Sequence, residues 1–108
     1  MLKGHLDSII LAIVAEGPAH GYSIIEEIKH RSRGTFDLPE GTIYPALHRL
    51  EESALLSSTW VTKDGGRRRR VYSLTRAGTT ALKTRRKTWS DFAQAVDSLL
   101  GGGRVWPA

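Results

Sequence analysis

Residues 58–74 read STWVTKDGGRRRRVYSL, two strand-like runs separated by a glycine-containing segment. Residues 58–62 and 70–74 are rich in β-branched and aromatic side chains, which is typical of β-strands. The segment between them contains an Asp-Gly pair and a Gly-Gly pair, which suit the positive φ angles of a hairpin turn. Because a single hairpin is only marginally stable in water, it must pack on other elements of the chain. The sequence therefore predicts a β-hairpin that rests on helices.

Helical spacing of apolar residues predicts three helices before the hairpin and one after it. The first covers residues 6–16 and ends at Gly17-Pro18, and the second covers residues 21–31. The third has an apolar face with the spacing i, i+4, i+7, i+11 that starts at Ile43. Since Pro45 is tolerated only in a first turn, this helix is expected to begin at residue 41 or 42, with Thr42 as its N-cap.

A long final helix is predicted from Thr75 to about residue 100, where three consecutive glycines stop it. Three helices, a hairpin and a further helix make a fold that is mainly α with a small β-hairpin, namely a winged helix-turn-helix followed by a C-terminal dimerisation helix. We expect residues 1–75 to form the DNA-binding domain, residues 76–100 the dimerisation helix, and residues 101–108, with Trp106, a flexible tail. The third helix would enter the DNA major groove, and the hairpin would be the wing.

Composition and charge agree with an anionic partner. The chain has 108 residues, no cysteine and a net charge of +5, so it is expected to be one domain without disulfides. Residues 63–87 contain ten basic side chains and one acidic side chain, whereas residues 1–62 carry a net charge of −3. A basic block of this kind favours a nucleic acid over a merely solvated surface. The longest apolar run, residues 9–15, is too short to span a bilayer, so we expect a soluble cytoplasmic protein.

Several short motifs repeat a known pattern along the chain. They are Leu6-Asp7, EGPAHGY at residues 16–22, GTIYPALHRLE at 41–51, GGRR at 65–68 and YSLTRAG at 72–78. Together they resemble the PadR-like transcriptional regulators over about residues 6–100. The resemblance implies a winged helix, a homodimer joined by the C-terminal helix, and operator binding, usually as a repressor. With one helix after the wing, the chain is similar to the short branch of that family.

The resemblance and the position of the basic block together indicate the DNA-binding side chains. They lie at the front of the third helix and one turn on, at the start of the supporting helix, and at the wing. The candidates are Tyr22, Thr42, Tyr44, Pro45, His48, Arg49, Lys63, Arg67, Arg68 and Arg69. For four of them a purely structural role stays open. Both tyrosines could pack between helices, Thr42 could serve as nothing more than a helix cap, and His48 could be a surface residue without a role in binding. Since side chains alternate along a strand, at most one of Arg69 and Arg70 is expected to face DNA.

The final helix carries an apolar stripe with a heptad step, which is typical of a two-helix seam. The final helix is too long for the rest of a chain of this size to cover, so we expect it to pair with a second copy of the chain. The other side of the first helix, with small and largely uncharged side chains, is the expected docking surface. The seam is Leu82, Trp89, Phe92, Val96 and Leu99, and the docking side is Ser8, Leu11, Ala12 and Ala15.

A small-molecule effector at this seam is one of three options. In the short PadR-like branch, a tryptophan at the position of Trp89 lines a drug-binding cavity between subunits. The resemblance therefore implies a planar aromatic or hydrophobic effector, an acidic aromatic effector paired with an arginine, or no effector at all. The candidate lining is Ser8, Ala12, Arg86, Trp89, Phe92 and Ala93.

Other functions find little support in the sequence. The four histidines are scattered without metal-ligand spacing, and no phosphate-binding loop or nucleophile motif is present. We therefore expect no enzymatic activity, no cofactor and no metal. The strongest rival is a nucleic-acid-binding winged-helix protein without sequence specificity and without an effector. A winged helix that makes only protein contacts would not need the arginine cluster.

Overall fold

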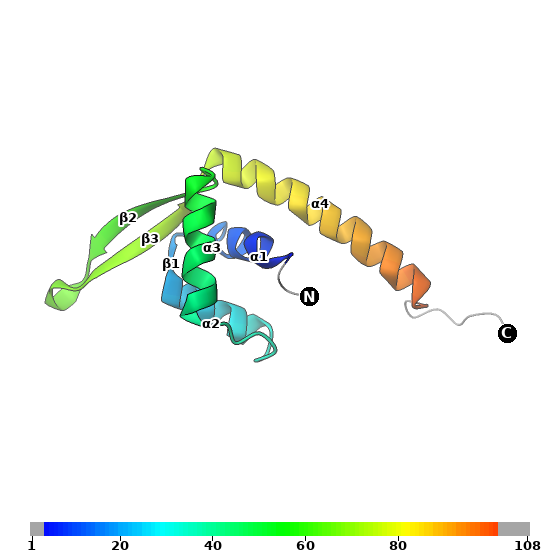
Figure 1. The fold of residues 1–108 in the computed structure, drawn as a ribbon, viewed down its shortest axis with the longest axis horizontal. Coiled ribbons are helices and arrows are strands. Elements are labelled where there is room, and N and C mark those ends of the chain that lie inside the picture. The colour runs from blue at the N-terminus through cyan, green and yellow to red at the C-terminus, as the bar shows by residue number, and fades with distance from the viewer. Residues whose placement is uncertain (1–3, 102–108) are drawn as a thin grey trace.

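The structure is a computed structural model, and it describes residues 4–101. Its helices and strands follow one another in the order of a winged helix (Figure 1). They are α1 (Leu6–Val14), β1 (Ala19–His20), α2 (Gly21–Arg31), α3 (Glu40–Glu52), β2 (Leu56–Thr62), β3 (Arg68–Leu74) and α4 (Arg76–Leu99), with a short 3-10 turn at Asp64–Gly66. The expected fold class is confirmed. The expected tail, apart from Gly101, lies outside the described residues.

The sheet has three antiparallel strands in the order β1-β3-β2. Both hairpin strands begin two residues earlier than the sequence pattern suggested, and their register pairs Leu56 with Leu74 and Thr62 with Arg68. Gly65 and Gly66 have φ angles of 82° and 79°, so the turn has the positive φ angles that its glycines predicted. The two-residue strand β1 was not expected from the sequence. It anchors the base of the wing to the start of α2.

The hydrophobic core lies among α1, α2, α3 and the base of the sheet. Ile10, Leu11, Ile24, Ile43 and Leu47 are fully buried there. Helix α1 is central because it contacts α2, α3, α4 and β3. The expectation that Leu11 lies on a free side of α1 is therefore wrong: α4 of the same chain covers that side. Ser8, Ala12 and Ala15 remain partly or largely exposed.

Helix α3 begins earlier than expected. Pro39 is its N-cap, with φ −76° and ψ 158°, and Glu40 is its first residue. Thr42 is therefore an exposed residue of the first turn, and the expectation that it caps the helix is wrong. Pro45 is the sixth residue of α3, one or two residues further in than expected, so the carbonyl of Gly41 lacks its usual i+4 backbone partner. The core contacts of Ile43 and Leu47 on either side of Pro45 keep the helix continuous.

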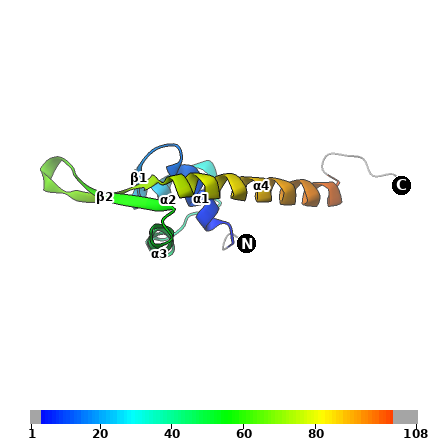
Figure 2. The ribbon, with the colours of Figure 1, turned by 90° about the horizontal axis from the view of Figure 1, so that it is seen from above.

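Helix α4 starts on the body and then leaves it (Figure 2). Only Gly78 and Leu82 are buried along its 24 residues. Leu82, which was expected at the seam between two copies, is 4% exposed and belongs to the core of its own chain. Trp89, Phe92 and Leu99 are 52%, 56% and 76% exposed, and the ring of Trp89 meets that of His5 edge-on with centroids 5.0 Å apart. The C-terminal half of α4 therefore presents large apolar side chains that the rest of residues 4–101 leaves more than half exposed.

Replacing Thr75 with alanine is expected to lower the free energy of unfolding by about 1 kcal/mol. Its hydroxyl accepts a hydrogen bond from the Gly78 N–H (2.9 Å) and lies 2.7 Å from the Ala54 carbonyl, so it caps α4 and ties it to the loop after α3. Urea unfolding of the variant and of Thr79→Ala, whose hydroxyl bonds only the carbonyl of Thr75, measures the difference. Equal stability of the two variants would contradict this role of Thr75.

Candidate nucleic-acid interface

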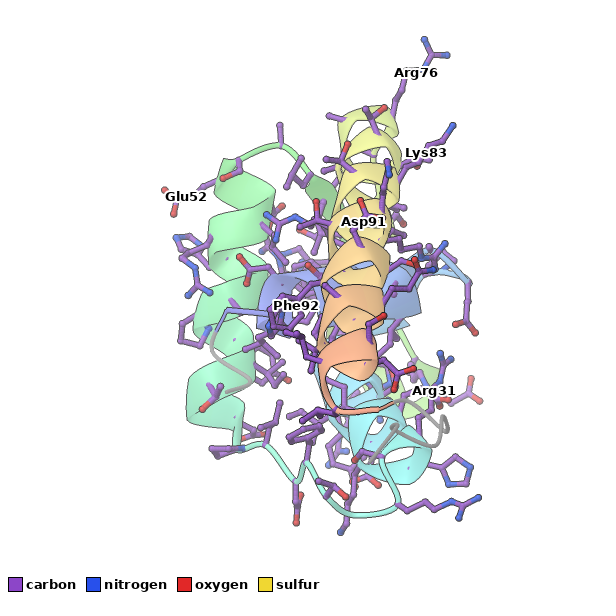
Figure 3. The ribbon with its side chains drawn as sticks, turned by 90° about the vertical axis from the view of Figure 1, so that its right-hand side faces the viewer. Arg31, Glu52, Arg76, Lys83, Asp91 and Phe92 are labelled. Atoms are coloured by element: carbon purple, nitrogen blue, oxygen red, sulfur yellow. The ribbon has the colours of Figure 1, made fainter. Side chains whose placement is uncertain are left out.

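Helix α3 presents a polar outer face to solvent and an apolar face to the core. Thr42, Pro45, His48 and Arg49 are all exposed on the outer face, and Glu52 marks its C-terminal end (Figure 3). This is the face that a recognition helix places in the major groove. The sequence prediction that these side chains share one surface is consistent with their placement.

Two of these side chains already have partners within the chain. Arg49 Nη2 lies 3.1 Å from Asp7 Oδ1, which links α3 to α1. His48 Nε2 lies 3.3 Å from Glu52 Oε1 on the next turn. Both pairs are largely exposed, and exposed ion pairs contribute little to stability. They can therefore be exchanged for contacts with a DNA phosphate or a base edge at small cost.

The tyrosines at the interface divide between packing and exposure. The ring of Tyr44 lies so close to Gly21 that a Cβ on that glycine would come within 2.5 Å of the ring. Tyr44 thus packs α3 against the start of α2, although it remains 42% exposed. Tyr22 is 57% exposed and stacks on His20 with ring centroids 6.4 Å apart. Part of the Tyr44 side chain is therefore buried between the two helices, whereas most of the Tyr22 side chain is exposed to solvent.

The arginines of the wing point in different directions. Arg68 and Arg70 share one face of β3, and both guanidinium groups lie over the ring of Trp60, at 4.8 and 5.4 Å from its centroid. Arg70 also contacts Glu51 of α3 at 3.4 Å. Arg69 points to the opposite face, where its Nη1 lies 2.8 Å from His20 Nε2. Lys63, Arg67 and Arg68 make no ion pair within the described part of the chain.

His20 is a residue of this interface that the sequence analysis missed. Its Nδ1 lies 3.3 Å from the Ser23 backbone N–H at the start of α2, and its Nε2 faces Arg69. Both neighbours are donors, and a neutral imidazole has one unprotonated nitrogen, so only one of the two contacts can be a hydrogen bond at a time. Burial lowers the pKa of His20, and the charges of Arg69 and Lys63 lower it further. The unexpected strand β1 brings His20 to the wing, and no sequence pattern indicated that pairing.

His20 is expected to titrate below the ordinary range for histidine, which proton NMR of its ring can measure. Because its pKa is lower in the folded chain than in the unfolded chain, the neutral form is favoured by folding. That contribution to stability is present above the unfolded pKa and is lost as the pH falls through the unfolded pKa toward the lowered folded pKa. His20→Gln should remove part of this acid sensitivity. A normal titration of His20 would contradict this placement.

The residues expected to line an effector site fall into two separate places. Arg86 lies in an open groove of about 350 Å³ together with Ala15, Leu74 and Lys83. Trp89 and Ala93 lie further along α4 in a shallower groove of about 390 Å³. Ser8 is engaged with Arg85, whose Nη1 lies 3.3 Å from its hydroxyl. One protomer thus does not bring all the candidate residues into one cavity.

Two further features of the described residues concern metal binding and membrane insertion. No group of three or more histidine, aspartate or glutamate side chains within residues 4–101 is arranged to hold a metal ion. In the same part of the chain, no helix is long and apolar enough to cross a membrane.

A three-helix core, a three-stranded sheet with a basic wing and an exposed outer face on α3 define a winged-helix protein. Comparison with known proteins places it more narrowly, because the sequence profile of the transcriptional regulator PadR-like family matches residues 10–84. The chain belongs to this family. It is therefore a transcriptional regulator, and DNA binding follows from that class.

Individual relatives agree with this assignment. The chain is 41% identical over 93 residues to transcriptional regulator Rv3488 of Mycobacterium tuberculosis, which covers 86% of this chain and 80% of the relative. It is 31% identical over 102 residues to an uncharacterised protein of Lysinibacillus sphaericus, with 94% of each chain covered. The crystal structure of a PadR-like transcriptional regulator from Bacillus cereus superposes with a TM-score of 0.82 at 29% identity, covering 93% of this chain and 95% of the other. A PadR family regulator from Clostridium difficile R20291 gives a TM-score of 0.77 at 32% identity, covering 90% and 99%.

Proposed function

We propose that this protein is a homodimeric, sequence-specific DNA-binding repressor that a planar aromatic or hydrophobic small molecule releases from its operator. The observation that carries the proposal is the combination of an uncovered α4 with an exposed recognition face on α3. Two copies paired through α4 present two such faces, which fit a pseudo-palindromic operator with half-sites one helical turn, ~34 Å, apart.

The uncovered apolar side chains of α4 support the dimer. Trp89 and Phe92 form a ring pair with centroids 5.8 Å apart, and each is more than half exposed in one protomer. Figure 3 shows Phe92 and Lys83 on opposite sides of α4. Arg85, one heptad before Phe92, shares the side of the apolar stripe and reaches Ser8 of α1. Exposed aromatic side chains grouped in this way mark a protein–protein contact more often than free surface. Val96 and Leu99 continue the same stripe toward the C-terminus.

The division of labour at the DNA follows from side-chain chemistry. Thr42, Tyr44 and Pro45 at the front of α3, followed by His48 and Arg49, would approach base edges and give sequence preference. Lys63, Arg67, Arg68 and Arg69 on the wing, with Tyr22 at α2, would contact phosphates and give affinity that depends little on sequence. Arg69 would first have to leave His20.

The effector site would lie at the dimer seam, where Trp89 offers a flat face and Phe92 and Ala93 lie beside it. Ser8, Ala12 and Arg86 of either protomer would complete it only if pairing brings the two grooves together. Titration of flat aromatic compounds, followed by the emission of a variant that keeps Trp89 as its only tryptophan, tests the site. If no compound changes either that emission or the affinity for DNA, the effector is removed from the proposal while the repressor remains.

Binding to selected and shuffled DNA tests the function as a whole. A duplex that the protein enriches from a randomised pool should bind on the order of 1,000-fold more tightly than a shuffled duplex of the same composition. Thr42→Ala and Tyr44→Phe should lower this ratio without much change in binding to the shuffled duplex. Reporter transcription from a promoter that contains the enriched site should fall when the protein is expressed. A rise would make it an activator.

The alternative is a winged-helix protein that binds nucleic acid without sequence preference. The basic block at residues 63–87 favours it as much as it favours the repressor. Equal affinity for both duplexes, with a steep dependence on salt, would establish this alternative in place of the repressor.

A further inference from the structure

A chain of contacts joins the recognition helix to the wing. Glu51 of α3 accepts a hydrogen bond from the hydroxyl of Ser58 in β2 at 2.6 Å, and Arg70 Nε of β3 donates to the same hydroxyl at 2.8 Å. Arg70 Nη2 also lies 3.4 Å from both carboxylate oxygens of Glu51. The Arg70 guanidinium then lies over Trp60, whose ring is shared with Arg68. We call these residues, Glu51, Ser58, Arg70, Trp60 and Arg68, the α3–wing brace.

The two arginines of the brace differ in their ion pairing and exposure. Arg70 has its charge matched by Glu51, and both side chains are less than half exposed, at 41% and 27%. Arg68 is exposed, makes no ion pair within residues 4–101, and is oriented only by the Trp60 ring. Arg70 is thus committed to contacts inside the protein, whereas Arg68 keeps its hydrogen-bond donors free for a phosphate.

The register of the hairpin makes this arrangement specific. Trp60 is the cross-strand partner of Arg70, and Arg68 lies two residues along β3 on the same face. Ser58 lies on that face too, opposite Tyr72, whose buried ring belongs to the core. Arg69 holds the opposite face of the wing to His20, and among the described side-chain contacts the brace is the link between the wing and α3.

We propose that Glu51 is a positioning residue for DNA binding: through Ser58, Arg70 and Trp60 it fixes the angle between α3 and the wing and so holds Arg68 at the phosphate backbone while α3 occupies the groove. This inference rests on the proposed contact of the wing with DNA. It assigns roles to Glu51 and Trp60, which the sequence did not indicate as part of the DNA-binding surface, and it gives Arg70, which the sequence left open as a DNA contact, a role inside the protein.

The negative charge of Glu51 allows the proposal to be distinguished from a purely electrostatic effect. A carboxylate on a DNA-facing helix repels phosphate, so its neutralisation should strengthen binding if electrostatics alone decide. The brace predicts the opposite for Glu51→Gln, namely about tenfold weaker binding to both the enriched and the shuffled duplex. Glu52→Gln is a matched control, because it removes the same charge from the next residue, whose carboxylate contacts only His48. Because it removes a repelling charge from the outer face of α3 and releases His48, that variant should bind DNA more tightly than the wild type.

A double-mutant cycle tests whether Glu51 acts through Arg68. Arg68→Ala should weaken binding about tenfold in the wild-type background and much less in the Glu51→Gln background, because Arg68 is already out of position there. Arg70→Lys keeps the charge but cannot bridge Ser58 and Glu51 in the same way, and it should reproduce the effect of Glu51→Gln. Thermal unfolding of each variant controls for loss of the fold.

A spectroscopic readout separates positioning from DNA chemistry. In a variant with Trp89→Phe and Trp106→Phe, the emission of Trp60 reports the brace in the absence of DNA. Glu51→Gln should make Trp60 more accessible to acrylamide, since Arg70 is released from its place over the ring, and Glu52→Gln should not.

The brace is overturned if Glu51→Gln binds DNA as tightly as Glu52→Gln, if its effect adds to that of Arg68→Ala without coupling, or if Trp60 accessibility does not change. The effect of Glu51→Gln is measured as a loss of affinity for both duplexes. The repressor proposal fails on a different result, namely that the wild-type protein binds both duplexes equally well.

Discussion

Replacing Arg67 and Arg68 together with alanine should weaken binding to every duplex, enriched or shuffled, by on the order of 100-fold at low salt. Both side chains are exposed and make no ion pair within the described residues, so their guanidinium groups are free to bind phosphate. Each lost phosphate contact should also flatten the slope of log K against log salt by about 0.9, or nearly two units for the pair. Fluorescence anisotropy at several salt concentrations measures both effects.

The matched control for the wing is the double variant Lys83→Ala and Lys87→Ala. It removes the same net charge from the same basic block, but from α4 on the far side of the body from the wing (Figure 1). A small, uniform loss is expected there from the reduced net charge, without the change in slope. Equal effects of the two double variants would mean that only the total charge matters, and the wing would lose its assigned role.

Replacing Trp89 and Phe92 together with serine should weaken dimer formation by at least about 2 kcal/mol, or roughly 30-fold, because buried aromatic side chains are the usual hot spots of an interface. The fold of the protomer should survive, since both rings are more than half exposed within one chain. Thermal unfolding at low protein concentration and sedimentation velocity measure the two quantities separately.

The same variant should lose high-affinity operator binding, because a single recognition helix gains no avidity from a second half-site. Lys87→Ala with Asp91→Ala is the control: it removes an exposed ion pair from the same stretch of α4 with no net change in charge. That control should dimerise and bind DNA as the wild type does. A wild-type association constant in the Trp89 and Phe92 variant would place the dimer contact elsewhere.

Much of the fold could be predicted from local patterns. The turn glycines at residues 65 and 66, the apolar faces of the first three helices and the start of the last helix at about Thr75 all follow from short-range chemistry, and the structure confirms them. The predicted start of α3 was late by one or two residues because Pro39, which has no side chain that can cap, is the N-cap in place of Thr42. The burial of Leu11 was missed because helical spacing shows that a face is apolar but not which element covers it.

The sequence could predict the part of the interface where basic residues follow one another along the chain. It could not predict which arginine pairs with a residue that is distant in sequence. Four consecutive arginines indicated the wing, but only the register of β2 and β3 shows that Arg70 turns to Glu51 while Arg69 turns to His20. His20 reaches the wing through β1, whose two residues carry no pattern that a sequence could reveal. Contacts between residues 19 to 49 positions apart decide these pairings, and they depend on tertiary packing.

Sedimentation equilibrium of the wild-type protein at micromolar concentration tests whether two copies pair through α4. Two chains of 11.9 kDa that pair through α4 predict a species of twice that mass, and addition of the enriched duplex should give a complex with two chains per DNA. A single species at the mass of one chain, which binds the duplex as a monomer, would contradict the account.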